Sequence, residues 1–470
     1  MVALRLNLGV PTTSTFYHLK NSKSPPPFPA RLRAANKKKP EICTADELHY
    51  VPVSTSDWKL ALWRYLPSPT RKRNHPLLLL SGVGTNAIGY DLSPESSFAR
   101  FMSGQGFDTW ILELRGAGLS VLNMEYGEDT EAVSKTDRLK SKLLGTFIRL
   151  FGTLSGPFFE DNYSGENFTV AKQIKEFRQK FLNIIEEGQH SSKSQFFDFQ
   201  DRFSNTLEDF LKQVDLILKY DWDFDHYLEE DLPAAMEYIR TQCCPKDGKL
   251  LAVGHSMGGI LLYAMLSKFC FEGRDPGLTS VTTLASSLDY TPSKSSLKLL
   301  LPVANPAKTF NVPIIPIGAL LAAAHPFASR PPYILSWLNP QISAPGMMHP
   351  KLFDKLVMNN FCSVPAKLLL QLTTAFEEGG LRNRNGSFFY KDHLGKSNVP
   401  VLAIAGDQDL ICPPEAVYET VKVIPEHLVT YQVFGEPRGP HYAHYDLVGG
   451  HLAAHQVYPC IINFLNRHDA

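Results

Sequence analysis

Six short apolar runs, separated mostly by stretches of helical periodicity, constrain the fold of this chain more than any other feature. They cover residues 77–80, 109–114, 250–253, 278–284, 399–404 and 429–434. Apolar runs of this length without polar alternation are typical of strands buried on both faces of a sheet. Because strand-like and helix-like segments alternate, the pattern predicts an α/β fold with a mostly parallel sheet flanked by helices. Two earlier runs, residues 48–53 and 59–65, are separated by a short polar turn and predict an opening hairpin.

Two long stretches do not fit this alternation. Residues 121–220 repeat apolar side chains at helical spacing, which predicts a helical insertion. Residues 291–395 are rich in proline and apolar side chains, which predicts an apolar cap, or lid, over the sheet. The predicted core is therefore discontinuous and consists of residues 46–120, 221–290 and 396–470.

The most apolar part of the predicted cap is too short to cross a bilayer. It covers residues 312–324 and contains Pro313 and Pro316, whereas a transmembrane helix needs about 20 apolar residues. We therefore expect no transmembrane segment. A core segment, a lid and an interfacial loop in peripheral contact with a membrane remain as interpretations.

The first 45 residues have the composition of a targeting segment. Residues 1–40 contain eight lysines and arginines, no aspartate or glutamate, and the hydroxyl-rich run Thr12-Thr13-Ser14-Thr15. No apolar stretch of the secretory kind precedes the basic residues, so the composition predicts a transit peptide. Plastid import (the chloroplast) is favoured and mitochondrial import is the alternative; a disordered leader without a targeting role is the third interpretation.

Charge and cysteine usage exclude several classes of protein. The chain has 47 basic and 47 acidic residues, so without the eight basic side chains of the leader its net charge is about −8, which argues against nucleic acid as a partner. The seven cysteines have no metal-type spacing. We expect free thiols, no metal and no cofactor.

The segment Gly254-His255-Ser256-Met257-Gly258 lies directly between an apolar strand-like run and a helical pattern. A Gly-x-Ser-x-Gly motif in this context predicts a nucleophile elbow, a sharp turn that exposes the serine hydroxyl at the edge of the sheet. The helix N-terminus that follows adds a positive dipole where negative charge develops. A tight strand-to-helix turn without catalytic function is the alternative.

A serine nucleophile needs a base and a carboxylate that orients the base. Two carboxylates, Asp407 and Asp409, follow the run 399–404. Three histidines, His441, His444 and His451, follow the last apolar run. The residues alone leave both choices open.

The oxyanion of an acyl-transfer reaction needs two backbone donors. One is expected from Met257, directly after the nucleophile, and the other from Val83, in the glycine-rich loop after the run 77–80. A glycine turn without this role is the alternative for the loop.

Four segments resemble the α/β-hydrolase superfamily, and within it the acid-lipase and monoglyceride-lipase type. They are Ser81-Gly82-Val83, Arg115-Gly116-Ala117-Gly118-Leu119-Ser120, the elbow around Ser256, and His444-Tyr445-Asp446-Leu447. The last resembles the His-x-Asp-Phe signature of acid lipases, which implies that His444 is the base; the spacing from Gly406 implies Asp409 as the acid. Ser81 stands where such lipases have histidine. The leader and the insertions also resemble a group of plant α/β-hydrolases of the plastid.

The resemblance implies a serine hydrolase that cleaves carboxylic esters of lipid-like or other small molecules through an acyl-serine intermediate. An acyltransferase that uses the same triad is the nearest alternative. A noncatalytic ligand-binding protein of the same fold is the alternative from a different class. The residues that bind the substrate are not indicated by the sequence.

Overall fold

The computed structural model describes residues 40–70, 72–122, 221–300, 314–315, 317–329 and 336–469. Their centre is a nine-stranded sheet with the order β1-β2-β4-β3-β6-β7-β10-β11, in which β5 pairs with β2. The strands are β1 (Glu47–Pro52), β2 (Trp58–Tyr65), β3 (Leu77–Leu80), β4 (Thr109–Glu113), β5 (Val121–Leu122), β6 (Leu250–His255), β7 (Leu278–Leu284), β10 (Val401–Gly406) and β11 (Val429–Phe434). Within this order, β4, β3, β6, β7, β10 and β11 are parallel to one another.

The predicted mostly parallel sheet is confirmed, and so is the opening hairpin. Strands β1 and β2 pair antiparallel, and β2 continues antiparallel onto β4. The central strands are buried along their whole length, as their uninterrupted apolar runs predict. Strand β11 alternates between half-buried and exposed residues because it lies at the edge of the sheet.

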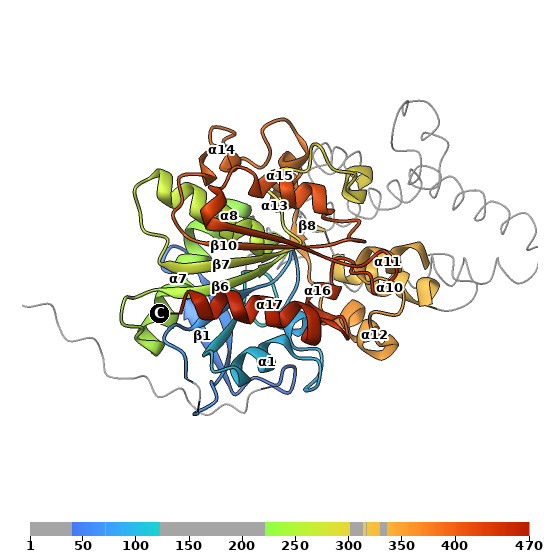
Figure 1. Ribbon diagram of the computed structural model, residues 1–470, viewed down its shortest axis with the longest axis horizontal. Helices are drawn as coiled ribbons and strands as arrows, with labels where there is room; N and C mark the ends of the chain where they lie inside the picture. The colour runs from blue at the N-terminus through green and yellow to red at the C-terminus, as the bar shows by residue number, and fades with distance from the viewer. Residues whose placement is uncertain are drawn as a thin grey trace, which may run out of the picture. The chain divides into compact units, whose positions relative to one another are not determined.

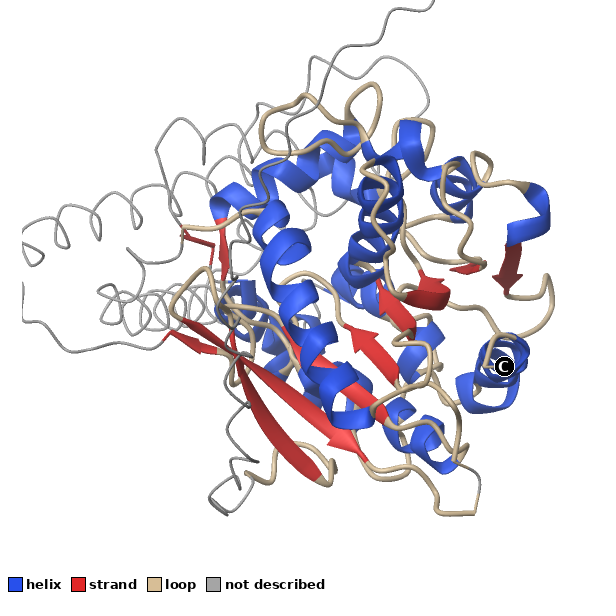
Figure 2. Cartoon of the chain, turned by 90° about the vertical axis from the view of Figure 1, so that its left-hand side faces the viewer, coloured by secondary structure: helices blue, strands red, loops and turns tan. Residues whose placement is uncertain are grey.

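Helices pack on both sides of the sheet (Figure 2). In the view of Figure 1, α8 and α15 lie above β10, β7 and β6, and α17 and α1 lie below these three strands. Phe98 of α1 and Tyr458 of α17 are in edge-to-face contact with ring centroids 4.9 Å apart. The core helices are α1 (Phe98–Gly104), α6 (Phe224–His226), α7 (Leu232–Cys243), α8 (Met257–Phe271), α15 (Pro414–Val421), α16 (Asp446–Gly449) and α17 (Ala453–Arg467), with a π-helical turn at Tyr227–Asp231 and 3₁₀ turns at Ala87–Tyr90 and Glu426–Leu428.

The region predicted as a cap contains short helices and one two-stranded sheet. The helices are α10 (Ile317–Ser329), α11 (Asn339–Ile342), α12 (Pro350–Asn359), α13 (Ala366–Thr373) and α14 (Tyr390–Leu394), with 3₁₀ turns at Ser296–Leu300, Ser336–Leu338 and Thr374–Phe376. Strands β8 (Ile314–Ile315) and β9 (Val364–Pro365) pair antiparallel. Helices α10, α11 and α12 gather on the right of the strands in Figure 1.

Two of the predicted segments are described only in part. The predicted insertion, residues 121–220, lies outside the described residues apart from Val121–Leu122, which form β5 and so extend the sheet beyond the predicted boundary. In the apolar stretch 312–324, the described residues form β8 and the first part of α10. Within the described part of the chain, no helix has the length and apolarity needed to cross a membrane.

The register of the sheet brings distant segments to one edge. Leu80, the last residue of β3, pairs with Gly254 near the end of β6, and Leu284 at the end of β7 pairs with both His255 and Ile404. Because parallel strands end at the same edge, the loops after β3, β6 and β10 converge there.

Candidate active site

Ser256 occupies a strained turn between β6 and α8. Its backbone has φ 55° and ψ −123°, a positive φ that is rare for a residue with a side chain. The turn is fixed on both sides, because the Ser256 N–H donates to Leu284 O at 2.8 Å and the Ser256 carbonyl accepts from the Gly259 N–H at 3.0 Å. The backbone here forms a sharp turn from strand to helix, and the strain falls on the serine itself.

The glycines that flank Ser256 are required by close packing. A Cβ at Gly258 would collide with the Leu80 carbonyl oxygen, and a Cβ at Gly254 would lie 2.5 Å from the Gly258 carbonyl carbon. Neither glycine has a positive φ. They allow α8 to start directly against β3 and β6, which presents its N-terminus at the sheet edge.

Asp409 and His444 are joined at this same edge. His444 Nδ1 lies 2.8 Å from Asp409 Oδ2, and both residues are buried. The other carboxylate oxygen, Oδ1, accepts from the N–H groups of Ile411 at 2.9 Å and Cys412 at 2.8 Å. The carboxylate is therefore held by three donors and cannot rotate away from the imidazole.

The competing residues form other contacts. His441 Nδ1 lies 2.5 Å from Asp407 Oδ2, and this histidine side chain is 40% exposed. Asp407 also accepts from the Tyr442 N–H at 2.9 Å. His451 is exposed, and its Nδ1 lies 3.0 Å from the Met347 carbonyl oxygen. Of the three histidines, His444 is the one that contacts a residue of the elbow.

That contact is made by His255. Its Nε2 lies 2.9 Å from the His444 carbonyl oxygen, and the two rings are 4.8 Å apart. Since a carbonyl only accepts hydrogen bonds, Nε2 carries the proton and His255 is the donor. Burial, and then the nearby charge of His444, lowers the pKa of His255 to about 3, so this imidazole is neutral at physiological pH.

The loop after β3, residues Ser81–Asn86, lies against the nucleophile; we call it the oxyanion loop. A Cβ at Gly82 would lie 3.3 Å from Ser256 Cβ and 3.7 Å from Ser256 Oγ. Ser81 Oγ donates to Asn86 O at 3.4 Å, and Thr85 Oγ1 donates to Gly82 O at 2.8 Å. Both bonds close the loop on itself, with Val83 at its turn.

Met257 and Val83 are the two candidates for the backbone donors to an oxyanion. Met257 is the first residue of α8, where an N–H has no acceptor within the helix. Val83 directly follows Gly82, the residue that touches the nucleophile.

Sequence analysis did not identify Glu113, a buried carboxylate at the end of β4. It accepts from the Ala87 N–H at 2.9 Å and from the Leu119 N–H at 2.7 Å, which links the segment after the oxyanion loop to the glycine-rich loop after β4. Burial raises the pKa of Glu113, while these backbone donors oppose the shift. A lone acid in the apolar run 109–114 was the available signal.

Asp446, quoted only as part of a signature, also has a positional role. Its carboxylate accepts from Ser343 Oγ at 2.6 Å and from the N–H groups of Ala344 and Ala443 at 2.7 and 2.8 Å. Burial raises its pKa. The side chain fastens the loop that carries His444 to the cap.

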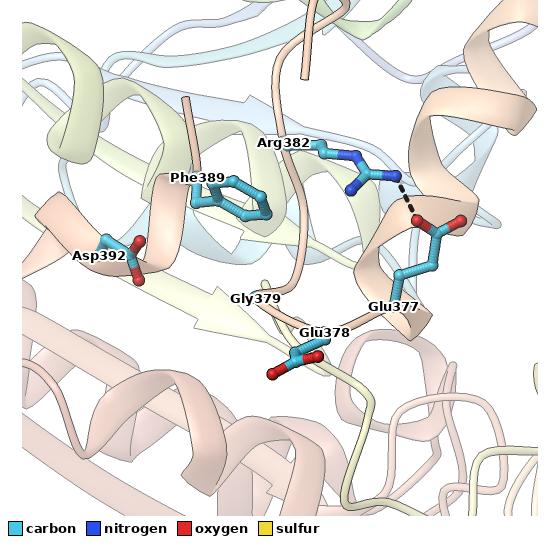
Figure 3. A pocket seen from close by; sticks show the side chains of 6 residues that line it. All are labelled: Glu377, Glu378, Gly379, Arg382, Phe389 and Asp392. Atoms are coloured by element: carbon cyan, nitrogen blue, oxygen red, sulfur yellow. Dashed lines mark hydrogen bonds and ion pairs between the residues drawn. The ribbon is translucent and has the colours of Figure 1, made fainter. Parts of the chain in front are cut away.

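A surface pocket lies among other residues. It is lined by Glu377, Glu378, Gly379, Arg382, Phe389 and Asp392, and the Arg382 guanidinium pairs with Glu377 (Figure 3). None of these residues belongs to the elbow, the oxyanion loop or the Asp409–His444 pair. The candidate active site is therefore defined by the sheet edge and not by this pocket.

The fold and the elbow define the class of protein. The sequence matches the alpha/beta hydrolase fold family over residues 211–446, about half of the chain. The chain belongs to this family. A comparison with curated proteins found no match.

Several solved structures resemble the chain at low sequence identity. A soluble variant of monoglyceride lipase from Saccharomyces cerevisiae, in complex with a substrate analogue, is 13% identical, with a TM-score of 0.49 over 94% of this chain and 99% of the lipase. An esterase from Thermogutta terrifontis is 13% identical, with a TM-score of 0.46 over 90% of this chain and 100% of the esterase. A proline iminopeptidase from Mycobacterium smegmatis is 14% identical, with a TM-score of 0.42 over 90% and 99%.

Proposed function

We propose that the protein is a serine hydrolase that cleaves carboxylic esters. In this mechanism His444 removes the proton from Ser256 Oγ, and the oxygen attacks the ester carbonyl carbon. The resulting oxyanion binds the N–H groups of Val83 and Met257. His444 then protonates the departing alcohol, and water hydrolyses the acyl-Ser256 ester by the same steps in reverse order.

The observation that carries this proposal is the hydrogen bond between Asp409 and His444 at the edge of the sheet where the half-buried Ser256 lies. Asp409 makes Nδ1 the protonated ring nitrogen, because a carboxylate accepts hydrogen bonds. Nε2 is then the atom that can act as a base. Two further observations support the proposal: Ser256 lies on a strained turn, and Gly82 of the oxyanion loop approaches Ser256 closely.

The direct test is covalent labelling of Ser256 with a fluorophosphonate. The full chain should be labelled at this residue, and Ser256→Ala should not be labelled. Ester turnover should fall by roughly 10⁴- to 10⁶-fold in the same variant. Equal labelling of the variant would refute the assignment, and a protein that binds esters without turnover would be a noncatalytic receptor.

We further propose lipid-like substrates, since the cap region, residues 291–395, is rich in apolar segments. A panel of esters graded by acyl chain length tests this.

If water and glycerol compete for a labelled acyl group, transfer to glycerol in preference to water would instead assign an acyltransferase. Contact with a membrane surface through the cap is a part of the same proposal, tested by flotation with lipid vesicles.

The leader is proposed to direct import into plastids. A fusion of residues 1–45 to a fluorescent protein should accumulate in chloroplasts of plant cells. Accumulation in mitochondria would support the alternative import route, and a cytosolic distribution would refute a targeting role.

A further inference from the structure

The last residue of α12 and the three residues after it, which lead towards β9, are hydrogen-bonded to the oxyanion loop. We call this segment, Asn359–Cys362, the connecting segment. The Cys362 N–H donates to Gly84 O at 2.6 Å, and the Asn86 N–H donates to Asn360 O at 3.0 Å. Between these bonds, Thr85 and Phe361 form an antiparallel bridge. One short ladder therefore joins the cap to the loop that carries Val83.

The Asn86 side chain adds bonds in both directions, including a long one from its Nδ2 to Cys362 Sγ at 4.0 Å. Its Nδ2 donates to the Asn359 carbonyl oxygen at 2.8 Å, and its Oδ1 accepts from the Ile88 N–H at 3.0 Å. The second bond caps the 3₁₀ turn Ala87–Tyr90. Asn86 is 9% exposed, so water does not easily replace either bond.

The other end of this arrangement is anchored in the sheet. The Ala87 N–H, one residue after Asn86, donates to the buried carboxylate of Glu113 at the end of β4. The oxyanion loop is thus held on one side by the core and on the other side by the connecting segment. Asn86 lies where the two anchors meet.

The connecting segment is an integral part of the cap. It begins at the last residue of α12 and leads towards β9, which pairs with β8 just before α10. Gly318 of α10 lies so close to the Phe361 carbonyl that a Cβ there would collide with it. Helices α10 and α12 are also joined by His325 Nε2 and Asp354 Oδ1, 2.8 Å apart.

We propose that Asn86 is a positioning residue that couples the cap to the oxyanion loop, so that the placement of the Val83 N–H depends on the placement of α10 and α12. This inference rests on the proposed function. An oxyanion donor acts only within about 2.7–3.1 Å of the developing charge, and a displacement of about 1 Å can cost about 10²-fold in rate. A substrate that engages the cap would in this way also set the geometry of catalysis.

Two variants of Asn86 test the coupling. Asn86→Asp keeps the oxygen that caps Ile88 but loses the donor to Asn359 O, and Asn86→Ser replaces the amide donor with a shorter hydroxyl without adding charge. Both should lower kcat for a soluble p-nitrophenyl ester by about 10- to 100-fold, with KM changed by less than about threefold. The rate is divided by the concentration of active sites, titrated to completion with a fluorophosphonate.

Asn359→Asp is the matched control. Its Nδ2 donates to Lys355 O within α12, and its side chain is exposed. The substitution is the same as in Asn86→Asp, but the bond from Asn86 goes to the backbone carbonyl of residue 359, which the substitution does not change. Its kcat should stay within about twofold of the wild type. A role of Asn86 in stability alone would lower the titrated fraction and the melting temperature but leave kcat per active site unchanged.

The outcomes separate this inference from the proposed function. If the wild type is labelled at Ser256 and hydrolyses esters while both Asn86 variants keep the wild-type kcat per active site, the coupling is refuted and the hydrolase assignment stands. If the wild type is neither labelled nor active, both fail together. A loss of kcat in Asn359→Asp equal to that in Asn86→Asp would also refute the specific role of Asn86.

Discussion

His444 Nδ1 lies 2.8 Å from Asp409 Oδ2, and the remaining oxygen of that carboxylate is bound by two backbone N–H groups. Two residues earlier in the chain, Asp407 makes a similar contact with His441, at the surface. Two aspartate–histidine pairs therefore join the loop after β10 to the segment before α16, and one of them adjoins the elbow. Substitution of Asp409 and of Asp407 in turn therefore compares the two pairs.

Asp409→Asn should lower kcat for ester hydrolysis by about 10⁴-fold. The asparagine amide would offer Nδ1 of His444 either an N–H donor or a weaker oxygen acceptor. The imidazole would then no longer be held with its proton on Nδ1, so Nε2 would no longer be free to act as the base. Steady-state kinetics on a p-nitrophenyl ester measures this effect. Far-UV circular dichroism verifies that the fold is retained.

Asp407→Asn is the control for this experiment. It perturbs the exposed pair with His441 and should leave kcat within about tenfold of the wild type, because the altered pair does not reach the elbow. A larger loss in Asp407→Asn than in Asp409→Asn would transfer the role of the acid to Asp407.

Gly82→Ala should lower kcat/KM by at least about tenfold, since the new methyl group would lie 3.3 Å from Ser256 Cβ and occupy space beside the nucleophile. Gly104→Ala, at the end of α1, is the matched control. No atom lies within 4 Å of its ideal Cβ, so activity should be unchanged and stability should stay equal or rise by up to about 1 kcal/mol. Equal activity of both variants would show that the oxyanion loop does not border the reaction.

His255 predicts a dependence of stability on pH. In the unfolded chain it binds a proton below its ordinary pKa of 6.5, whereas burial, and then the charge of His444, lowers the pKa in the folded protein to about 3. The unfolded state thus binds more protons between these values. As the pH falls from 6.5 towards 3, this residue should reduce the free energy of unfolding by up to about 1.4 kcal/mol for each pH unit.

His255→Gln isolates this contribution, because glutamine can still donate to the His444 carbonyl but does not titrate. Urea denaturation at pH 7 and pH 5 should show a decrease in stability that is smaller in the variant by about 2 kcal/mol. If the decrease is the same in both proteins, His255 does not carry the acid sensitivity.

Arg115→Leu should lower the free energy of unfolding by about 3–5 kcal/mol, since it leaves the fully buried Asp231 without its cation. Arg115 Nε and Nη2 lie 2.8 and 2.5 Å from Asp231 Oδ1. Arg382→Leu is the comparison, because Arg382 pairs with the exposed Glu377 and should cost at most about 1 kcal/mol. Chemical denaturation of both variants measures the difference, and similar costs would contradict the argument from burial.

The strands and the elbow could be predicted from the sequence because their signals are local. An apolar run such as 77–80 indicates a buried strand by itself, and glycines around Ser256 indicate a turn that has no room for side chains. The boundaries moved only slightly: the run 399–404 became β10 at Val401–Gly406.

The partners of side chains could not be derived from local signals. Neither the spacing nor the composition distinguishes Asp407 from Asp409 or His441 from His444; the resemblance to lipases selected Asp409 and His444, and the three-dimensional structure joins these two. Glu113 and Asn86 were missed because each has a hydrogen bond to a segment that only the folding of the chain brings close, Ala87 for Glu113 and Asn359 for Asn86. Asn86 Nδ2, for example, binds a carbonyl 273 positions later, and such a contact depends on how the cap folds back.

The pairs Asp407–His441 and Asp409–His444 can be compared with each other within one molecule. One pair is buried and the other is partly exposed, yet both consist of the same groups and join the loop after β10 to the segment before α16. The downfield proton resonance of the enclosed histidine could be compared with that of the exposed histidine in one NMR sample. The molecule thus carries an internal reference for the effect of shielding from water on the hydrogen bond that orients a general base.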